Sequence, residues 1–134
     1  MARRFLIAGN WKMNGLKADG LALAADVASR TKSGSSPKFE MLVCPAATLI
    51  SSVVDTVAGS GVAVGGQDCH MQEKGAHTGD ISAWMLKDLG CTYVIVGHSE
   101  RRPNHGETDA VVKAKAEAAL AAGLIAIVCV GETL

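Results

Sequence analysis

The feature that most limits how this chain can fold is a series of five short apolar runs, most of them rich in Val and Ile, spread along its 134 residues. Each run is too short for a typical helix, and none alternates cleanly with polar residues, which is the pattern of strands covered on both faces of a parallel sheet. The runs begin roughly 20 to 35 residues apart, far enough for a crossover between parallel strands. They are Phe5–Gly9, Phe39–Cys44, Val62–Gly66, Thr92–Gly97 and Leu124–Gly131.

Each of the four intervals between these runs carries a helical pattern of apolar residues. Ser82 is a candidate N-cap for the third helix, which Gly90 would end. Thr108 or Asp109 would cap the fourth helix, which Gly123 would end. The apolar stripes of the four helices comprise Leu16, Gly20, Leu23 and Val27; Leu49, Ile50, Val53, Val54 and Val57; Met85 and Leu89; and Val112, Ala116 and Leu120.

Strands that alternate with helices indicate an α/β fold, with parallel βα repeats joined by right-handed crossovers. We expect five strands with four intervening helices. No linker divides the chain, so residues 1–134 are expected to form a single domain. Periodicity leaves two architectures open: an open, doubly wound five-stranded sheet, or part of an eight-unit barrel.

Composition excludes several classes of protein. Hydrophobic residues make up 49% of the chain and charged residues 19%, which is too apolar for a disordered chain. The 13 Lys and Arg balance the 13 Asp and Glu without a long basic run, so no nucleic-acid partner is expected. No apolar stretch approaches the roughly 20 residues that cross a bilayer, so no membrane partner is expected. Four cysteines without a Cys-x-x-Cys pair, and no export signal, indicate buried reduced thiols and a cytoplasmic location.

Two clusters of polar residues follow the apolar runs, where the ligands of parallel α/β folds gather. After the first run, Lys12 would be a fixed cation suited to an anionic group such as phosphate, although a solvated loop lysine has the same spacing. After the fourth run, His98 would stand where a short helix begins, and helix amides favour a neutral imidazole there. Of Glu100, Arg101 and Arg102, at least two are expected to form ion pairs that lock the loop.

Other kinds of site find little support in the sequence. His70 and Glu73 have helical spacing, but no third ligand stands nearby, so no metal site is expected. His77 is expected to be a surface imidazole. The nucleophile motif Gly-x-Ser-x-Gly is broken by Arg101, and neither a P-loop nor a dinucleotide-binding glycine motif is present.

Six short motifs carry a more specific signal. They are Asn10-Trp-Lys-Met-Asn14, Gly66-Gln67, Gly75-Ala-His-Thr-Gly-Asp-Ile-Ser82, Val96-Gly-His-Ser-Glu-Arg-Arg102, His105-Gly-Glu-Thr-Asp109 and Cys129-Val-Gly-Glu132. In order and approximate spacing they resemble the triosephosphate isomerase family, and the resemblance covers residues 1–134. It implies a TIM (β/α)8 barrel, of which this sequence would supply the first five strands.

The resemblance also implies an activity and the residues that carry it. The reaction would be the interconversion of dihydroxyacetone phosphate and glyceraldehyde 3-phosphate, a step of glycolysis and gluconeogenesis, with no cofactor and no metal. Lys12 would contact the phosphate and other oxygens of the substrate, and Asn10 would help to bind and orient it. His98 would be the neutral electrophile that polarises the carbonyl in the enediolate step. Glu100 would be an auxiliary polar residue close to Lys12.

Further implications concern the partner subunit and the rest of the barrel. Thr78 would lie at the tip of a loop that inserts into the second subunit of a homodimer. Cys129 would be a buried structural thiol, and Glu132 an ion-pair partner in the loop network. The family's general base is a glutamate after the sixth strand, at the root of a lid loop, and no residue up to Leu134 matches it. We therefore expect this chain alone to be inactive or weakly active.

Two alternatives stay open at this point. The first is a non-catalytic truncated or engineered barrel fragment that self-associates or needs a complementing chain carrying strands six to eight. Its uncovered inner face and two unpaired sheet edges would favour association. The second is another phosphate-handling barrel enzyme, or an open flavodoxin-like sheet with the strand order 2-1-3-4-5.

Overall fold

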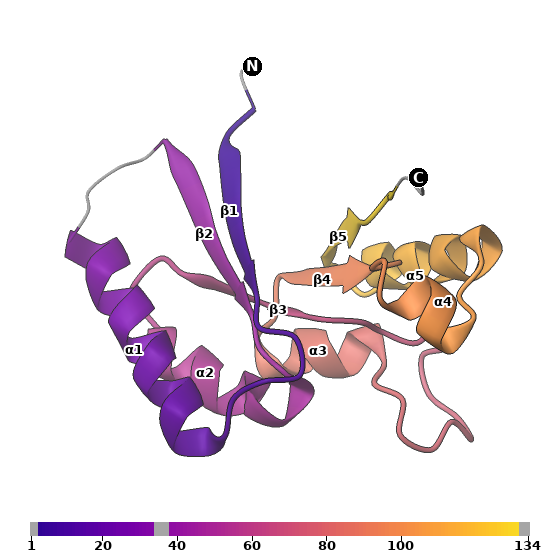
Figure 1. Cartoon of the computed structure of the whole chain (residues 1–134), viewed down its shortest axis with the longest axis horizontal. Helices are drawn as coiled ribbons and strands as arrows, with labels where there is room; N and C mark the ends of the chain where they lie inside the picture. The colour runs from indigo at the N-terminus through magenta and orange to yellow at the C-terminus, as the bar shows by residue number, and fades with distance from the viewer. Residues whose placement is uncertain (1–2, 34–37, 132–134) are drawn as a thin grey trace.

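A single parallel sheet organises the computed structural model, which describes residues 3–33 and 38–131. Within these ranges the sheet has five strands in the order β1-β2-β3-β4-β5, each parallel to its neighbour (Figure 1). This order confirms the parallel βα repeats and is incompatible with the flavodoxin-like order. The strands are β1 (Phe5–Asn10), β2 (Phe39–Cys44), β3 (Ala63–Gly66), β4 (Tyr93–Val96) and β5 (Ile125–Val128).

Helical segments fill every crossover between these strands, as the sequence indicates. The last crossover is more complex than one helix, because a short helix precedes the long one. Gly106 ends the short helix with a φ of 65°, and Thr108 caps the long one by accepting a hydrogen bond from the Val111 N–H. The helical segments are α1 (Lys17–Ser33), the 3₁₀ turn η1 (Ala47–Leu49), α2 (Ile50–Val57), α3 (Ala83–Leu89), α4 (Arg101–His105) and α5 (Asp109–Ala121).

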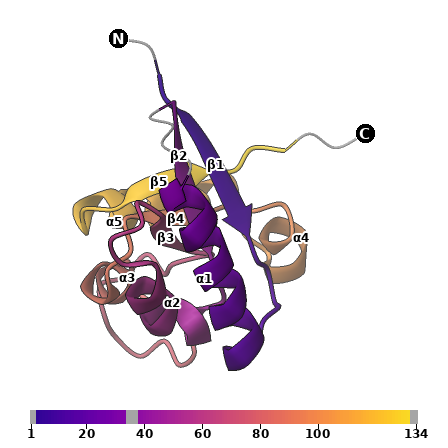
Figure 2. The same cartoon turned by 90° about the vertical axis from the view of Figure 1, so that its left-hand side faces the viewer.

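The sheet curls, and the helices cover its outer face. Figure 2 shows α1 beside α2, and α2 and α5 also contact strands of the sheet. Val43, Val64 and Val94 pack outward into the main core beneath these helices. On the inner face Leu42 and Tyr93 belong to a second buried cluster. Apolar contacts on both faces explain why the strand sequences do not alternate with polar residues.

Only part of the stripe that the sequence indicates for α1 is buried: Gly20 is buried and Val27 packs against the core, but the two leucines do not. Leu16, just ahead of the helix, is 79% exposed, and Leu23 is also exposed, whereas Ala24 and Ala28 are buried. A Cβ added at Gly20 would stand 2.7 Å from the Leu49 Cδ1 atom, so η1 approaches α1 too closely for a larger side chain. Small residues therefore form the buried contact, and the two leucines face away from it.

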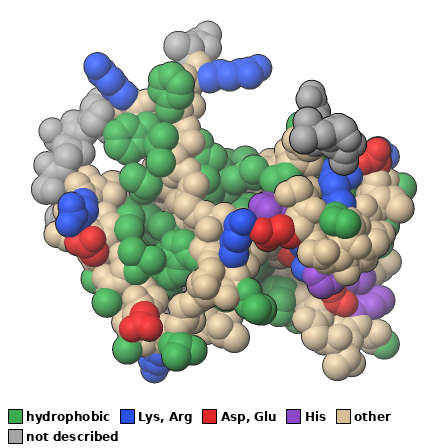
Figure 3. All heavy atoms as spheres, viewed as in Figure 1, with side chains coloured by type: hydrophobic (Ala, Val, Ile, Leu, Met, Phe, Trp, Pro, Cys, Tyr) green, Lys and Arg blue, Asp and Glu red, His purple; other side chains and the backbone are tan. Residues whose placement is uncertain are grey.

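Exposed apolar side chains gather on the two edge strands of the described sheet. Phe5 on β1 is 74% exposed, Ile7 is also exposed, and Ile125 and Val128 on β5 are about half exposed. Figure 3 shows hydrophobic side chains over β1 and β2 on the open side of the molecule. Such edges and patches are sites where a further strand or chain can add. Among the described residues, no helix combines the length and apolar character that a bilayer crossing requires.

Replacing Ser82 by alanine is expected to lower the free energy of unfolding by about 1 kcal/mol. Ser82 is the N-cap of α3, as the sequence indicates, and its hydroxyl oxygen accepts a hydrogen bond from the Met85 N–H at 3.2 Å. Urea denaturation measures the change. Ser51→Ala is the control, because Ser51 is an exposed residue within α2 and its replacement is expected to change stability by less than about 0.5 kcal/mol. Equal effects of the two substitutions would contradict the capping role.

Candidate active site

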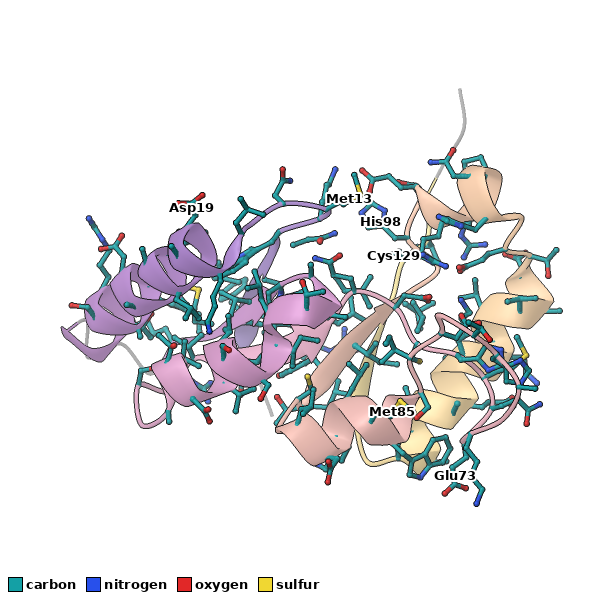
Figure 4. The ribbon with its side chains drawn as sticks, turned by 90° about the horizontal axis from the view of Figure 1, so that it is seen from below. Met13, Asp19, Glu73, Met85, His98 and Cys129 are labelled. Carbon is teal, nitrogen blue, oxygen red and sulfur yellow. The ribbon has the colours of Figure 1, made fainter. Side chains whose placement is uncertain are left out.

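An open hollow of about 620 Å³ lies at the carboxyl ends of β1, β3 and β4. Asn10, Lys12, His98 and Glu100 all line it, so the structure brings together the four residues that the resemblance assigns to catalysis or substrate binding. His98 and Met13, both labelled in Figure 4, lie on the loops after β4 and β1 that face each other across this opening. The common edge of a parallel sheet thus gathers side chains that are 88 residues apart in the chain.

Lys12 is held in an unusual backbone conformation. Its φ is 55°, and no other non-glycine residue within the described ranges has a positive φ. The Asn10 Oδ1 atom accepts a hydrogen bond from the Lys12 N–H at 2.9 Å, and the Gln67 Nε2 atom donates to the Lys12 carbonyl at 2.8 Å. Strained residues of this kind persist where the surroundings fix them, and they cluster at functional sites.

Gln67 also lines the hollow, and the sequence reasoning assigned it no role. It follows β3 directly, and its Nε2 atom donates both to the Lys12 carbonyl and to the Cys44 carbonyl at 2.9 Å. One amide group therefore ties the loop after β1 to the end of β2. Gln67 could have been identified from the sequence as a site residue, because it directly follows an expected strand in the Gly66-Gln67 motif. Site residues of parallel α/β folds gather at such strand ends.

Lys12 and Glu100 form an ion pair across the hollow. The Lys12 Nζ atom donates to Glu100 Oε1 at 2.6 Å, and both side chains are about half exposed. The hydrogen bond from Lys12 lowers the pKa of Glu100 below its usual value, despite some desolvation that raises it. An exposed pair of this kind adds little to stability, so its main effect is to fix where the ammonium group stands.

His98 is held by a backbone hydrogen bond that selects one tautomer. The Glu100 N–H donates to His98 Nδ1 at 3.1 Å, which leaves the ring proton of a neutral imidazole on Nε2. A Glu100 carboxylate oxygen also lies 3.7 Å from Nδ1, but an ion pair there would need a proton on the nitrogen that already accepts the amide bond. The hydrogen bond thus favours the tautomer that carries its proton on Nε2, the ring nitrogen that does not accept from the Glu100 amide.

Arg102 locks the loop that carries His98, as the sequence suggests for this cluster. Its guanidinium donates to the Gly97 carbonyl at 2.9 Å and to the Cys129 carbonyl at 3.1 Å, and it pairs with Asp109 at 2.6 Å. Arg101 forms ion pairs as well, so the expectation that at least two of the three charged residues after Ser99 are structural is confirmed.

Arg101 belongs to a cluster that we call the buried quartet: Asp68, Arg101, Glu107 and Lys115. Lys115 Nζ donates to Asp68 and to Glu107 at 2.9 Å each, and Arg101 pairs with the same two carboxylates. Only 5% of Lys115 and 8% of Glu107 are exposed, whereas Asp68 and Arg101 are partly exposed and line the hollow. The sequence reasoning missed this cluster, although Lys115 lies on the same helix face as the buried residue Val112.

The remaining sequence-based assignments have varied outcomes. Thr78 lies in an exposed loop, and its role in a dimer stays a prediction. Cys129 is only half-buried, so its assignment as a buried thiol is wrong, because β5 ends at Val128 and lies at the sheet edge. His77 is exposed, which confirms the expected surface imidazole, and its ring stacks on His70 with 4.0 Å between centroids. Glu132 lies outside the described residues. Among residues 3–33 and 38–131, no group of three His, Cys, Asp or Glu could hold a metal ion.

Comparisons with known proteins agree with this fold. The triosephosphate isomerase family model matches residues 5–134. The chain is 63% identical to the triosephosphate isomerase of Afipia carboxidovorans over 130 residues, which cover 97% of this chain and 51% of that protein. It is 60% identical to that of Hyphomonas neptunium, covering 98% of this chain and 52% of that protein. The chain thus spans about half the length of the curated relatives it matches.

A solved structure shows the same architecture. The crystal structure of triosephosphate isomerase from Bartonella henselae at 1.6 Å resolution superimposes with a TM-score of 0.86 and 48% sequence identity. The alignment covers 98% of this chain and 53% of that one. The curled sheet is therefore part of a TIM barrel, and periodicity alone could not decide this. Since the family model extends over nearly the whole sequence and the strand order agrees with it, we conclude that this chain belongs to the triosephosphate isomerase family.

Proposed function

We propose that this chain provides the phosphate-binding and carbonyl-polarising half of a site that interconverts dihydroxyacetone phosphate and glyceraldehyde 3-phosphate. The observation that carries the proposal is the convergence of Lys12 and His98 on one hollow, with Asn10 and Glu100 beside them. The name of the relatives supports the substrate, a small phosphorylated triose. The chemistry calls for no cofactor or metal, and a cytoplasmic location goes with it.

The side chains suit the steps that such an isomerisation requires. The Lys12 ammonium would attract the phosphate dianion and the substrate oxygens. When a base removes the proton from the carbon beside the carbonyl, the electron pair forms a carbon–carbon double bond and the carbonyl oxygen becomes an enediolate oxygen. The His98 Nε2–H would donate to that oxygen as its negative charge develops. A neutral imidazole is a weak enough acid to stabilise the oxyanion without giving up its proton irreversibly.

The general base is not among the residues of this chain that we can assign, so catalysis would need a segment that supplies it. Removal of a general base typically lowers the rate by about 10²- to 10⁴-fold. The alternative is a non-catalytic barrel fragment that self-associates or binds a complementing chain. The exposed apolar residues of the edge strands, Phe5 on β1 and Ile125 on β5 among them, favour association in either case.

A complementation experiment tests this proposal. We expect isomerisation to appear when the chain is mixed with a second polypeptide that supplies strands six to eight and their loops. Lys12→Ala in the mixture should lower kcat/KM by about 10²- to 10³-fold, because a preorganised charge at the reacting oxygens is lost. Lys17→Ala is the matched control, since Lys17 is an exposed lysine at the start of α1 and should leave the rate unchanged.

The outcomes separate the two candidates. A mixture that forms a stable complex on size-exclusion chromatography but never turns over substrate would contradict the isomerase proposal and favour the non-catalytic fragment. A compact monomer of the isolated chain that binds no hydrophobic dye would contradict self-association. Thr78→Arg in the active mixture would test the dimer, because a charged side chain at an inserted loop tip should shift the complex to smaller size.

A further inference from the structure

The buried quartet connects the candidate active site to the interior of the molecule. Asp68 lies just after β3, Arg101 begins α4, Glu107 stands between α4 and α5, and Lys115 is in the middle of α5. Glu107 Oε2 accepts from Arg101 at 2.6 Å and from Lys115 at 2.9 Å. Asp68 accepts from Lys115 at 2.9 Å and lies 3.1 Å from an Arg101 nitrogen. Two cations and two anions thus form a closed ring with no net charge.

Stability alone does not explain such a ring. Removing charges from water is costly, and apolar residues of similar volume often stabilise a core equally well or better. A charged ring does, however, fix the relative positions of the segments that carry it, because each bond has a preferred length and direction. Here the ring joins the end of β3, the start of α4, the connection after α4 and the middle of α5.

The turn that carries His98 is held by Arg101 as well as by Arg102. The Arg101 N–H donates to the His98 carbonyl at 2.8 Å, so the backbone of His98 moves with that of Arg101. The same turn presents the Glu100 N–H to His98 Nδ1. Helix α4 spans only Arg101–His105, which is too short to be stable by itself, so the turn depends on its tertiary anchors.

Lys115 is buried, and its ammonium group donates hydrogen bonds to both carboxylates of the quartet. Without its ammonium group, neither Asp68 nor Glu107 would be held in a fixed position relative to α5, because Lys115 is the donor on that helix to both side chains. Arg101 would then follow whichever carboxylate moved, and the Glu100 N–H would move with the Arg101 backbone. The contacts therefore form a continuous path from Lys115 to the imidazole ring.

We infer that Lys115 is a positioning residue for His98: through Asp68, Glu107 and Arg101 it holds the turn that keeps the His98 proton on Nε2. This inference rests on the proposed function at one point, since it takes His98 to be the electrophile of the proposed isomerisation. Lys115 does not reach the hollow and touches no reacting atom, so it acts entirely through the path of contacts.

Imidazole ¹⁵N NMR of the chain tests the inference, because the two tautomers give different Nδ1 and Nε2 resonances. Spectra are recorded at a pH where the rings are neutral, and His98→Gln identifies the His98 signals. The main variant is the double substitution Lys115→Met with Glu107→Gln, which removes one cation and one anion and leaves Arg101 paired with Asp68. Its balanced charge is expected to preserve the fold, which the dispersion of the amide spectrum reports.

We expect the His98 Nδ1 resonance of this double variant to move from the position of an unprotonated nitrogen toward the average of two tautomers. Lys113→Met is the matched control, since Lys113 is an exposed lysine on the same helix, and it should cause no shift. Val57→Ala is a second control: it removes apolar contacts from the core at the end of α2, lowers stability and should also cause no shift.

Two results would overturn the inference. One is an unchanged His98 Nδ1 resonance in the folded double variant, which would confine Lys115 to a structural role. The other is a comparable shift in Val57→Ala, which would show that any loss of stability frees the ring. Because the readout is a resonance of the chain itself, failure of the complementation assay would contradict the proposed function and leave this result standing.

Discussion

Replacing Glu107 by glutamine is expected to lower the free energy of unfolding by about 3–5 kcal/mol, which is among the largest effects of any single substitution in this chain. Glu107 is 8% exposed and its Oε2 atom accepts hydrogen bonds from Arg101 and Lys115. Glutamine keeps the shape of the side chain but not its charge. The buried Lys115 and the partly exposed Arg101 would then share Asp68 alone, and the uncompensated charge in a desolvated site accounts for the loss.

Urea denaturation measures this change, and Glu117→Gln is its matched control. Glu117 also pairs with a lysine, Lys113 at 2.8 Å, but both side chains are largely exposed on α5. Solvent screens such a pair, so the control is expected to cost less than about 0.5 kcal/mol. If Glu107→Gln lowers the free energy of unfolding no more than the control does, burial does not strengthen the ion pairs of the quartet.

The pH dependence of stability provides a second check on Glu107. Burial raises the pKa of Glu107, but the hydrogen bonds from Lys115 and Arg101 lower it by more, so that it lies below the ordinary value of 4.5. A lowered pKa in the folded state stabilises the protein above the ordinary value, and this contribution is lost as the pH falls through the folded-state pKa. We expect the parent chain to lose stability more steeply below pH 4.5 than Glu107→Gln does. Parallel curves would contradict the lowered pKa.

The strands, and the meeting of Lys12 and His98 at one end of the sheet, could be predicted from the sequence. The strands follow from local apolar runs, and the meeting of the two side chains follows from the parallel topology. The five apolar runs coincide with the five strands to within a few residues, since a strand buried on both faces needs a continuous apolar sequence. Once the strands are parallel, their carboxyl ends share one edge. Lys12 and His98 were therefore expected to meet before any contact was known.

What the sequence did not reveal depends on contacts between distant segments. A lysine in a helix is normally expected on the solvent-exposed face, and nothing in the local sequence marks Lys115 as buried. Its burial is possible only because carboxylates from two other segments pair with its ammonium group. The predicted stripe of α1 placed Leu16 and Leu23 beside Gly20 and Val27, because hydrophobicity favours leucine at buried positions. The close approach of Leu49 to Gly20 selects small residues instead. In both cases tertiary packing overrides the local preference of the residue.

Gly97→Ala is expected to lower the free energy of unfolding by about 2–5 kcal/mol, through backbone strain and a steric clash that act together. Gly97 has a φ of 70°, which costs a residue with a Cβ about 1–2 kcal/mol. A Cβ at this position would also stand 2.7 Å from the Val112 Cγ1 atom and 3.0 Å from Arg102 Nη2. Val112 is buried in α5 and has little room to move, so the clash should add about 1–3 kcal/mol.

Gly106→Ala separates these two contributions. Gly106 has a φ of 65°, close to that of Gly97, but no atom lies within 4 Å of the Cβ it would gain. Its substitution should therefore cost only the strain, about 1–2 kcal/mol by urea denaturation. Adding Val112→Ala to Gly97→Ala should recover part of the larger loss, because the smaller side chain vacates the space that the new Cβ needs. Equal losses at the two glycines, or no recovery in the double variant, would mean that the helix behind His98 is not packed against Gly97 as described.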